Sequence, residues 1–146
     1  GKIDFWSVKM RPAKPIAFGI LKNDISKPVP FLGLPGNPVS ALVAFEQFGR
    51  AAINKMMGKN SFKRPTIKAK IQDRIDNLDG RRVYARVIVT KNDGEYYANL
   101  TGNQSSNLLT SMAHANGLAI CPEGMTSKQP GEIVEVLMID WPEWVF

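Results

Sequence analysis

Most of the residues in this chain that could do chemistry bind oxyanions, and they fall at the ends of predicted elements. Arg11 and Lys14 flank Pro12, and Ser40 lies in the first turn of a predicted helix. Arg86 lies on a predicted strand. Guanidinium groups and hydroxyls near helix N-termini are the donors that a tetrahedral oxyanion or a phosphate needs. Further donors lie in a polar loop before another helix start: Gln104, Ser105 and Ser106.

Each of these residues has a plainer explanation when it is taken singly. Most arginines and lysines are surface residues, and most loop serines cap helices or turns. The prediction of an anion site therefore depends on the whole set.

The segment 31–40 predicts a second feature suited to an anion. Its first four residues are apolar, as in a short buried strand, and Gly36 then favours a tight turn. Asn37 is a good N-cap, and Pro38 suits the first helical position. A strand that leads into a helix in this way directs free N–H groups and the positive end of the helix dipole at one point. The alternative is a turn with no binding role.

The helix that follows is predicted to run to Met57, with Gly58 as its stop. Apolar residues at steps of three or four are expected to share one face of it: Val39, Leu42, Phe45, Gly49, Ala52, Ile53 and Met56.

Before this helix the chain has the pattern of an incomplete α/β region. Strands are expected over 5–11, 15–21 and 31–34. These are too few strands for a complete sheet domain, so we expect a preceding part of the protein to supply the rest. Residues 59–61 have the composition of a linker.

From Pro65 onward the alternation of apolar and polar residues predicts short strands around one helix. Asn92-Asp93-Gly94 is a strong hairpin signal. Asn116-Gly117 marks the end of the helix, whose expected apolar face is Leu108, Leu109 and Met112. A small, mostly antiparallel barrel or sandwich follows from strands near 67–72, 82–89, 95–100, 118–121 and 132–139.

The composition narrows the classes of function. The net charge of +6 favours an anionic partner, but the basic residues are scattered and do not choose between nucleic acid and a small oxyanion. Cys121 is the single cysteine and His114 the single histidine, so an internal disulfide, a zinc site and a Ser-His-Asp hydrolase are not expected. Cys121 is expected in the core and His114 on the surface. No apolar run is long enough to span a membrane.

Several motifs of this chain resemble the molybdopterin molybdenumtransferase family of the MoeA type, which is similar to the E domain of gephyrin. The motifs are Arg-Pro-Ala-Lys-Pro at 11–15, Gly-Leu-Pro-Gly-Asn-Pro-Val-Ser at 33–40 and Thr-Gly-Asn-Gln-Ser-Ser at 101–106. The strands near 80–86 and 131–136 match as well. The resemblance extends over essentially the whole chain.

The resemblance implies that the chain is a C-terminal part of such a protein. Residues 1–60 would then be the end of a MogA-like α/β domain, and residues 61–146 a C-terminal β-barrel-like domain. The family inserts molybdenum from molybdate into adenylylated molybdopterin and releases AMP with the help of Mg²⁺. It does so in the cytoplasm as a homodimer. On this basis we expect neither a membrane nor a nucleic acid as partner, and no turnover by this part alone.

The same resemblance implies which residues hold molybdate or a phosphate. Arg11, Ser40, Arg86 and Ser106 would form the site, supported by Pro12, Lys14, Gly36, Asn37 and Gln104. Arg11 takes the place of a usual Lys, and Ala13 that of a usual Gly, at a turn where an alanine is less free to adopt a positive φ. The expected Mg²⁺ ligands belong largely to parts of the family that this chain does not contain.

Two other classes remain open on the sequence. A basic barrel of this size could bind RNA, which a salt-dependent affinity would reveal. A protein scaffold is the other, and it would require an exposed apolar groove in the barrel.

Overall fold

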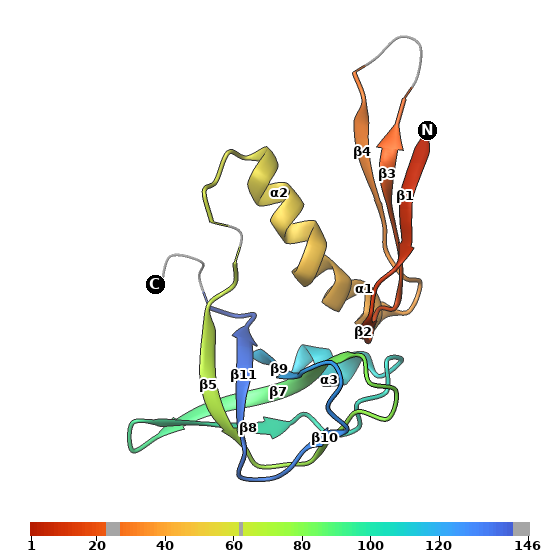
Figure 1. Cartoon of the computed structure of the whole chain (residues 1–146). Helices are drawn as coiled ribbons and strands as arrows, with labels where there is room; N and C mark the ends of the chain where they lie inside the picture. The colour runs from red at the N-terminus through yellow and green to blue at the C-terminus, as the bar shows by residue number, and fades with distance from the viewer. Residues whose placement is uncertain (23–26, 62, 142–146) are drawn as a thin grey trace.

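The computed structural model describes residues 1–22, 27–61 and 63–141, and it shows a projecting sheet, a long helix and a barrel (Figure 1). The projecting sheet is antiparallel and has the order β1-β3-β4. Its strands are β1 (Lys2–Ser7), β3 (Pro15–Leu21) and β4 (Val29–Gly33).

The strand expected over 5–11 is two strands in different sheets, so that prediction was wrong. β1 ends at Ser7, and β2 (Met10–Arg11) pairs in parallel with the barrel strand β7. The backbone N–H of Arg82 also donates to the carbonyl of Lys9 at 3.1 Å. The chain thus leaves one sheet and enters the other within two residues, because the barrel offers free backbone partners there.

The strand β4 is not buried as the apolar segment 31–34 predicted. It is an edge strand: the side chain of Val29 at its start is 52% exposed, and that of Leu34, just after its end, is 40% exposed. A sheet of three strands has too few neighbours to cover an apolar edge strand on both faces.

The predicted helix is confirmed from Pro38, with Asn37 at the N-cap, to Met56. It consists of α1 (Pro38–Ala44), a π-helical turn η1 (Phe45–Gly49) and α2 (Arg50–Met56). Gly58 follows with a φ of +73°, as expected of a helix stop. The Asn37 side chain does not cap the helix.

The predicted apolar face of the helix is present, but apart from Val39 it is not the face that packs on the barrel. Val39, Val43 and Ala44 are fully buried against the barrel, whereas Leu42 and Ile53 are each 41% exposed. Helical spacing identified a real apolar stripe, but that stripe lines a groove facing β3 and β4. The face that packs on the barrel carries the smaller side chains of Val39, Val43 and Ala44, which allow a close approach of the helix.

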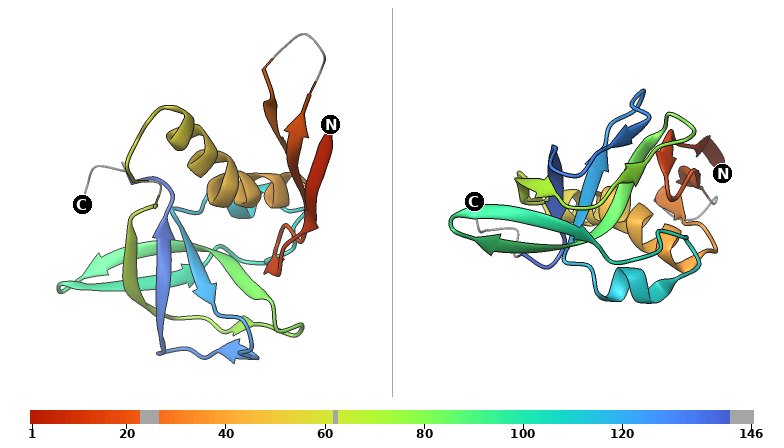
Figure 2. Two further views of the ribbon diagram at one scale, coloured as in Figure 1. Left: turned by 45° about the horizontal axis from the view of Figure 1, so that its top comes forward. Right: turned by 90° about the horizontal axis from the view of Figure 1, so that it is seen from below.

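The expected barrel is confirmed, and its sheet closes on itself through the pairing of β7 with β9 (Figure 2). The order is β7-β8-β5-β11-β9, and only β5 and β8 run parallel in this ring. The strands are β5 (Thr66–Ile71), β7 (Arg82–Asn92), β8 (Glu95–Leu100), β9 (Gly117–Cys121) and β11 (Ile133–Met138). A small two-stranded ribbon of β6 (Ile75–Asp76) and β10 (Ser127–Lys128) adds to it.

The hairpin between β7 and β8 follows the sequence signal. Asn92 pairs with Glu95, and the two residues between them have positive φ: +48° at Asp93 and +85° at Gly94. A two-residue turn with two positive φ angles matches the right-handed twist of the strands.

The short helix α3 (Leu109–Ala113) is present, but its expected apolar face is not buried. Leu108 and Leu109 are 39% and 49% exposed, and the buried residue of this helix is Ser111. Ser111 is buried because it binds an arginine of the barrel wall, described below.

Two clusters of apolar side chains hold the molecule together. One fills the barrel, and the alternation of β5 places Ile67, Ala69 and Ile71 in it. The other joins the N-terminal region to the barrel: Met10, Val39 and Val43 pack with Tyr84, Leu118 and Ile120. The start of the helix is therefore fixed against β7 and β9. No helix within the described ranges is long and apolar enough to cross a bilayer.

Candidate functional site

A cavity of about 650 Å³ lies where the start of α1, the strand β2 and the barrel meet. Its walls hold six of the nine residues that the sequence pointed to: Arg11, Pro12, Ser40, Arg86, Gln104 and Ser106. These residues come from both sides of the molecule, and the shared apolar cluster brings them together.

Arg86 carries a positive charge in the wall of this cavity and is only 1% exposed. Its Nε donates to the Ser111 hydroxyl at 3.2 Å, and its Nη2 donates to the Ser105 carbonyl at 3.1 Å. No ion pair joins it to a carboxylate of the described residues. Burial, and then the positive charge of Arg11, lower the pKa of Arg86 to about 10. Both causes act against the cation, so a negative charge in the cavity would stabilise it.

Gln104 binds the backbone of β7 rather than pointing both polar atoms into the cavity. Its Oε1 accepts from the Arg86 N–H at 2.8 Å, and its Nε2 donates to the Arg86 carbonyl at 3.2 Å. Gln104 thereby fixes the loop 101–106 to the strand that carries Arg86. The sequence suggested a ligand; the geometry shows a residue that positions the loop.

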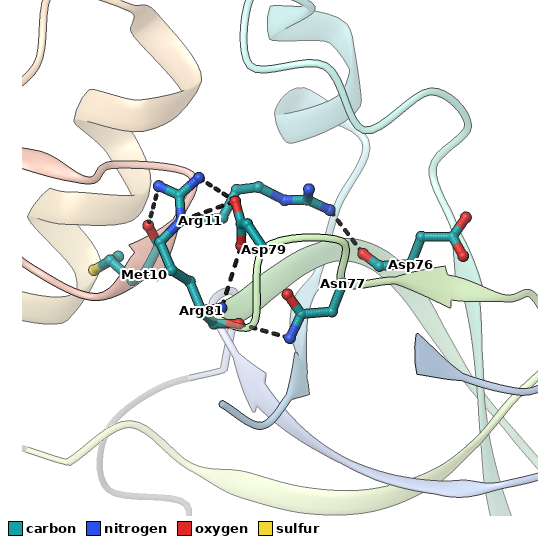
Figure 3. Close-up of polar contacts among 6 residues, drawn as sticks. All are labelled: Met10, Arg11, Asp76, Asn77, Asp79 and Arg81. Atoms are coloured by element: carbon teal, nitrogen blue, oxygen red, sulfur yellow. Dashed lines mark hydrogen bonds and ion pairs between the residues drawn. The ribbon is translucent and has the colours of Figure 1, made fainter. Parts of the chain in front are cut away.

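Arg11 is held at the rim by the turn between β6 and β7 (Figure 3). Its Nη2 donates to the Asp76 carbonyl at 2.7 Å. Arg81 in the same turn donates through Nη1 to the Met10 carbonyl at 3.4 Å and forms an ion pair with Asp79. These contacts attach β2 to the turn and so fix the position of the Arg11 backbone and side chain.

The turn beside Arg11 has the conformation that the sequence made doubtful for an alanine. Ala13 has a φ of +74°, and its side chain is buried in the shared apolar cluster. Alanine accepts the left-handed region here at a cost of about 1–2 kcal/mol, which the burial of its methyl group offsets in part.

Asn37 does not line the cavity, but it binds Ser106, which does. The Asn37 Nδ2 donates to the Ser106 Oγ at 3.2 Å, while its Oδ1 is buried without a partner among the described residues. Ser40 lies one helical turn further on, is 6% exposed and lines the cavity. None of the described hydrogen bonds engages the Ser40 hydroxyl, so it can donate to a bound ligand.

Lys14 and Gly36 do not line the cavity. Lys14 is exposed, and its carbonyl accepts from the Val8 N–H at 2.9 Å. Gly36 is exposed beside Asn37, with open space at its α-carbon. Their contribution is to the turns that carry Arg11 and Asn37.

Several cavity residues escaped the sequence analysis: Arg74, Asp76, Arg81 and Tyr84. Tyr84 belongs to the start of β7, and the others lie in or beside β6, which is too short to give a periodic signal. Only closure of the barrel places this turn beside β2. Arg74 and Asp76 form an ion pair at 2.7 Å, so this rim carboxylate is already neutralised.

The donor set suits an oxyanion and not a metal ion. Arg86 and Arg11 supply positive charge, and Ser40 and Ser106 supply hydroxyl groups. No three His, Cys, Asp or Glu side chains gather in the described part of the chain. The residues present therefore do not fit a Mg²⁺ site of their own.

Cys121 and His114 lie where the composition suggested. Cys121 is fully buried, and burial raises the pKa of its thiol. His114 is exposed at the end of α3. Neither lines the cavity.

The fold and the cavity define a barrel domain of the MoeA C-terminal class. Residues 68–139 match the family model described as "MoeA C-terminal region (domain IV)". A structure titled as a molybdopterin biosynthesis moeA protein from Pyrococcus horikoshii is similar with a TM-score of 0.74 and 27% identity. The matched region covers 97% of this chain and 33% of the Pyrococcus chain.

Curated relatives extend the similarity to nearly the whole chain. A molybdopterin molybdenumtransferase 1 of Mycobacterium tuberculosis is 35% identical over 144 residues, which are 95% of this chain and 33% of the relative. A molybdopterin molybdenumtransferase of Haemophilus influenzae is 30% identical over 141 residues, 93% of this chain and 33% of the relative. This chain belongs to the MoeA-type molybdopterin molybdenumtransferase family. It spans about a third of the length of these curated relatives.

Proposed function

We propose that this chain forms the oxyanion-binding part of an enzyme that transfers molybdenum from molybdate to adenylylated molybdopterin, with release of AMP. The observation that carries the proposal is Arg86, a buried cation facing a cavity without a carboxylate partner among the described residues. The names of the relatives supply the substrate class.

Four residues would hold the anion in this proposal. Arg86 and Arg11 supply charge from the barrel and from β2, and the hydroxyls of Ser40 and Ser106 supply directed hydrogen bonds. Ser106 is now bound by Asn37, and a ligand oxygen would compete for that hydrogen bond. Donors of this kind hold a tetrahedral dianion close to an acceptor without forming a bond to its metal, so that the metal can still be transferred.

We propose further that the chain contains parts of two domains. Residues 1–60 would be the end of a MogA-like α/β domain, and residues 61–146 the C-terminal barrel domain. A three-stranded sheet with exposed edges, followed by a helix, supports the first part. An apolar groove of about 810 Å³ between the helix and that sheet is a surface that the rest of such a domain would cover.

The full enzyme would work as a cytoplasmic homodimer with Mg²⁺ as its helper ion. The described residues offer no carboxylate cluster for Mg²⁺. The ion's ligands would therefore come from another part of the full enzyme. Nucleic acid and membrane are not among the proposed partners. The apolar groove does not lie in the barrel, so it does not favour a scaffold role for that domain.

Calorimetric titration of the chain with molybdate tests the proposal, alongside the variants Arg86→Ala and Ser106→Ala. We expect weak binding by the unmodified chain that both variants lose. Binding that survives in both variants would place the anion elsewhere. Molybdenum insertion by this chain alone would contradict the proposal that it forms only the oxyanion-binding part of the enzyme.

A further inference from the structure

Glu46, in the π-helical turn of the helix, binds two arginines that come from different elements. Its Oε2 accepts from the Arg50 Nε at 2.9 Å, within the helix. The same oxygen accepts from the Arg64 Nε at 2.9 Å and lies 2.8 Å from the Arg64 Nη2. The second contact joins the helix to the segment that leads into β5.

Arg64 is itself fixed to the barrel where β5 begins and β11 ends. Its Nη1 donates to the Trp141 carbonyl at 3.2 Å, after the end of β11. The next residue, Pro65, accepts from the Met138 N–H at 2.8 Å, and Thr66 pairs with Leu137. Through Arg64, the Glu46 carboxylate is tied to two neighbouring strands.

This contact lies largely out of solvent. The side chains of Arg64 and Glu46 are 8% and 13% exposed, against 28% for Arg50. Salt screens such a pair much less than a surface pair. Removal of one partner leaves the other charge buried, so the contact resists separation of the helix and the barrel.

The contact lies at the right place to orient the start of the helix. Ser40 precedes Glu46 by six residues, about 9 Å along a helix axis at 1.5 Å per residue. Asn37 is bound to Ser106 before it, and Val43 is buried between the two. A rod held at two separate points cannot rotate about the contact between them.

We propose that Glu46 is a positioning residue for the anion site: by binding Arg64 it fixes the helix on the barrel, so that Ser40 lines the same cavity as Arg86. The consequence for ligand binding rests on the proposed function, but the fixed orientation does not. Without the contact the helix can rotate about its apolar contact at Val43. Displacements of about 1 Å at a binding group are enough to cost much of its effect.

The test measures orientation and binding separately in the same chain. Spin labels on cysteines placed at Lys55 in α2 and Thr90 in β7, both exposed, report the distance between helix and barrel. The variant Arg64→Gln loses the contact between the two elements. We expect a broadened distance distribution and a molybdate affinity weakened by about tenfold. Arg50→Gln is the matched control, because it removes the contact of Glu46 within the helix and keeps the contact with Arg64, and it should leave both readouts close to those of the unmodified chain.

Exchange of the charges distinguishes positioning from a general loss of stability. Glu46→Arg combined with Arg64→Glu restores an ion pair between the helix and the segment before β5 but not the hydrogen bond to the Trp141 carbonyl, so it should restore part of the narrow distribution and part of the affinity. If Arg64→Gln does not fold, Glu46→Gln takes its place. An unchanged distance distribution in the folded variant would overturn the proposal. Absence of molybdate binding in the unmodified chain would refute the proposed function, while the distances still decide the role of Glu46.

Discussion

Arg86 places a positive charge in the wall of the barrel where water cannot solvate it fully. Two of its nitrogens bind Ser111 and Ser105, and this fixes the guanidinium plane. Each partner matches one edge of a planar fork, which a lysine does not have. The charge and the shape of Arg86 therefore contribute separately, and a lysine variant can separate them.

Arg86→Lys keeps the positive charge and loses the planar guanidinium with its fixed set of donors. We expect the free energy of unfolding to fall by about 1.5–3 kcal/mol, because the Ser111 and Ser105 bonds to a charged donor are lost or distorted. Molybdate affinity should fall at least about tenfold, since an ammonium is a point charge. Chemical denaturation and calorimetric titration measure the two effects. Arg82→Lys is the control, because Arg82 does not line the cavity and its ion pair with Glu123 is exposed, and it should change neither value much. Unchanged affinity in Arg86→Lys would show that the fork has no role.

The turn between β6 and β7 shows how a short element positions a distant residue. It contributes Asp79 and Arg81, whose ion pair keeps Arg81 aimed at the Met10 carbonyl. A hydrogen bond from Arg81 lowers the pKa of the Asp79 carboxyl. The folded chain therefore binds this proton less readily than the unfolded chain, whose pKa is near the ordinary value of 3.8.

This difference predicts the pH range in which Asp79 stabilises the fold. The contribution is fully present above the unfolded pKa and is lost as the pH falls through the lowered, folded pKa. Asp79→Asn should reduce the free energy of unfolding at pH 7 by less than about 1 kcal/mol, because the pair is partly exposed. The difference in the free energy of unfolding between the variant and the unmodified chain should vanish at pH values well below the folded pKa of Asp79. Denaturation at a series of pH values measures it, with Asp93→Asn as the control at an unrelated turn. A difference that does not change with pH would contradict the role of the charge.

The closure of the barrel depends on the start of β9. Gly117 pairs with Val87 on one side and Met138 on the other. A Cβ at this position would lie 2.6 Å from Cγ1 of Val136, a core side chain with little freedom to move.

Gly117→Ala should therefore destabilise the barrel by about 1–3 kcal/mol through overpacking. Thermal denaturation measures the loss. Gly36→Ala is the matched control, because Gly36 has open space around its α-carbon and an ordinary φ. Equal melting temperatures for the two variants would mean that β9 and β11 can move apart at little cost.

At the scale of the whole molecule, the two sides of the helix face different surroundings. One side is buried in the barrel, and the other lines the groove of about 810 Å³ with β3 and β4. Ile53 and Met56 on that side are 41% and 67% exposed. A contiguous apolar surface of this kind marks a contact site. We assign it to the remainder of the α/β domain, as proposed above.

The assignment predicts that the groove makes the chain bind apolar compounds. Met56→Lys combined with Ile53→Glu should lower the fluorescence of a bound hydrophobic dye by about twofold or more, with little change in stability, because both side chains are exposed. Leu78→Lys is the control, since Leu78 is 86% exposed at a barrel turn far from the groove in sequence and does not line it. Dye fluorescence that falls equally in the control would mean that the groove is not the binding surface.

The sequence by itself determined the local elements of this protein. Alternation in β5, the Asp93-Gly94 turn and the Pro38 start and Gly58 stop of the helix all follow from interactions within a few residues of the chain. The motifs also named six of the residues that line the cavity. These signals survive because propensity and turn chemistry act locally.

Only the tertiary structure decided which face each element buries. The helix turns Val43 and not Leu42 toward the barrel, and α3 buries Ser111 rather than its leucines. The strand expected over 5–11 divides because the barrel offers β2 a partner strand. The burial of the Arg86 guanidinium and the contact of Glu46 with Arg64 depend on segments that meet only in the folded chain. Burial is a property of the surfaces that meet, and a period along the chain cannot say which surface that will be.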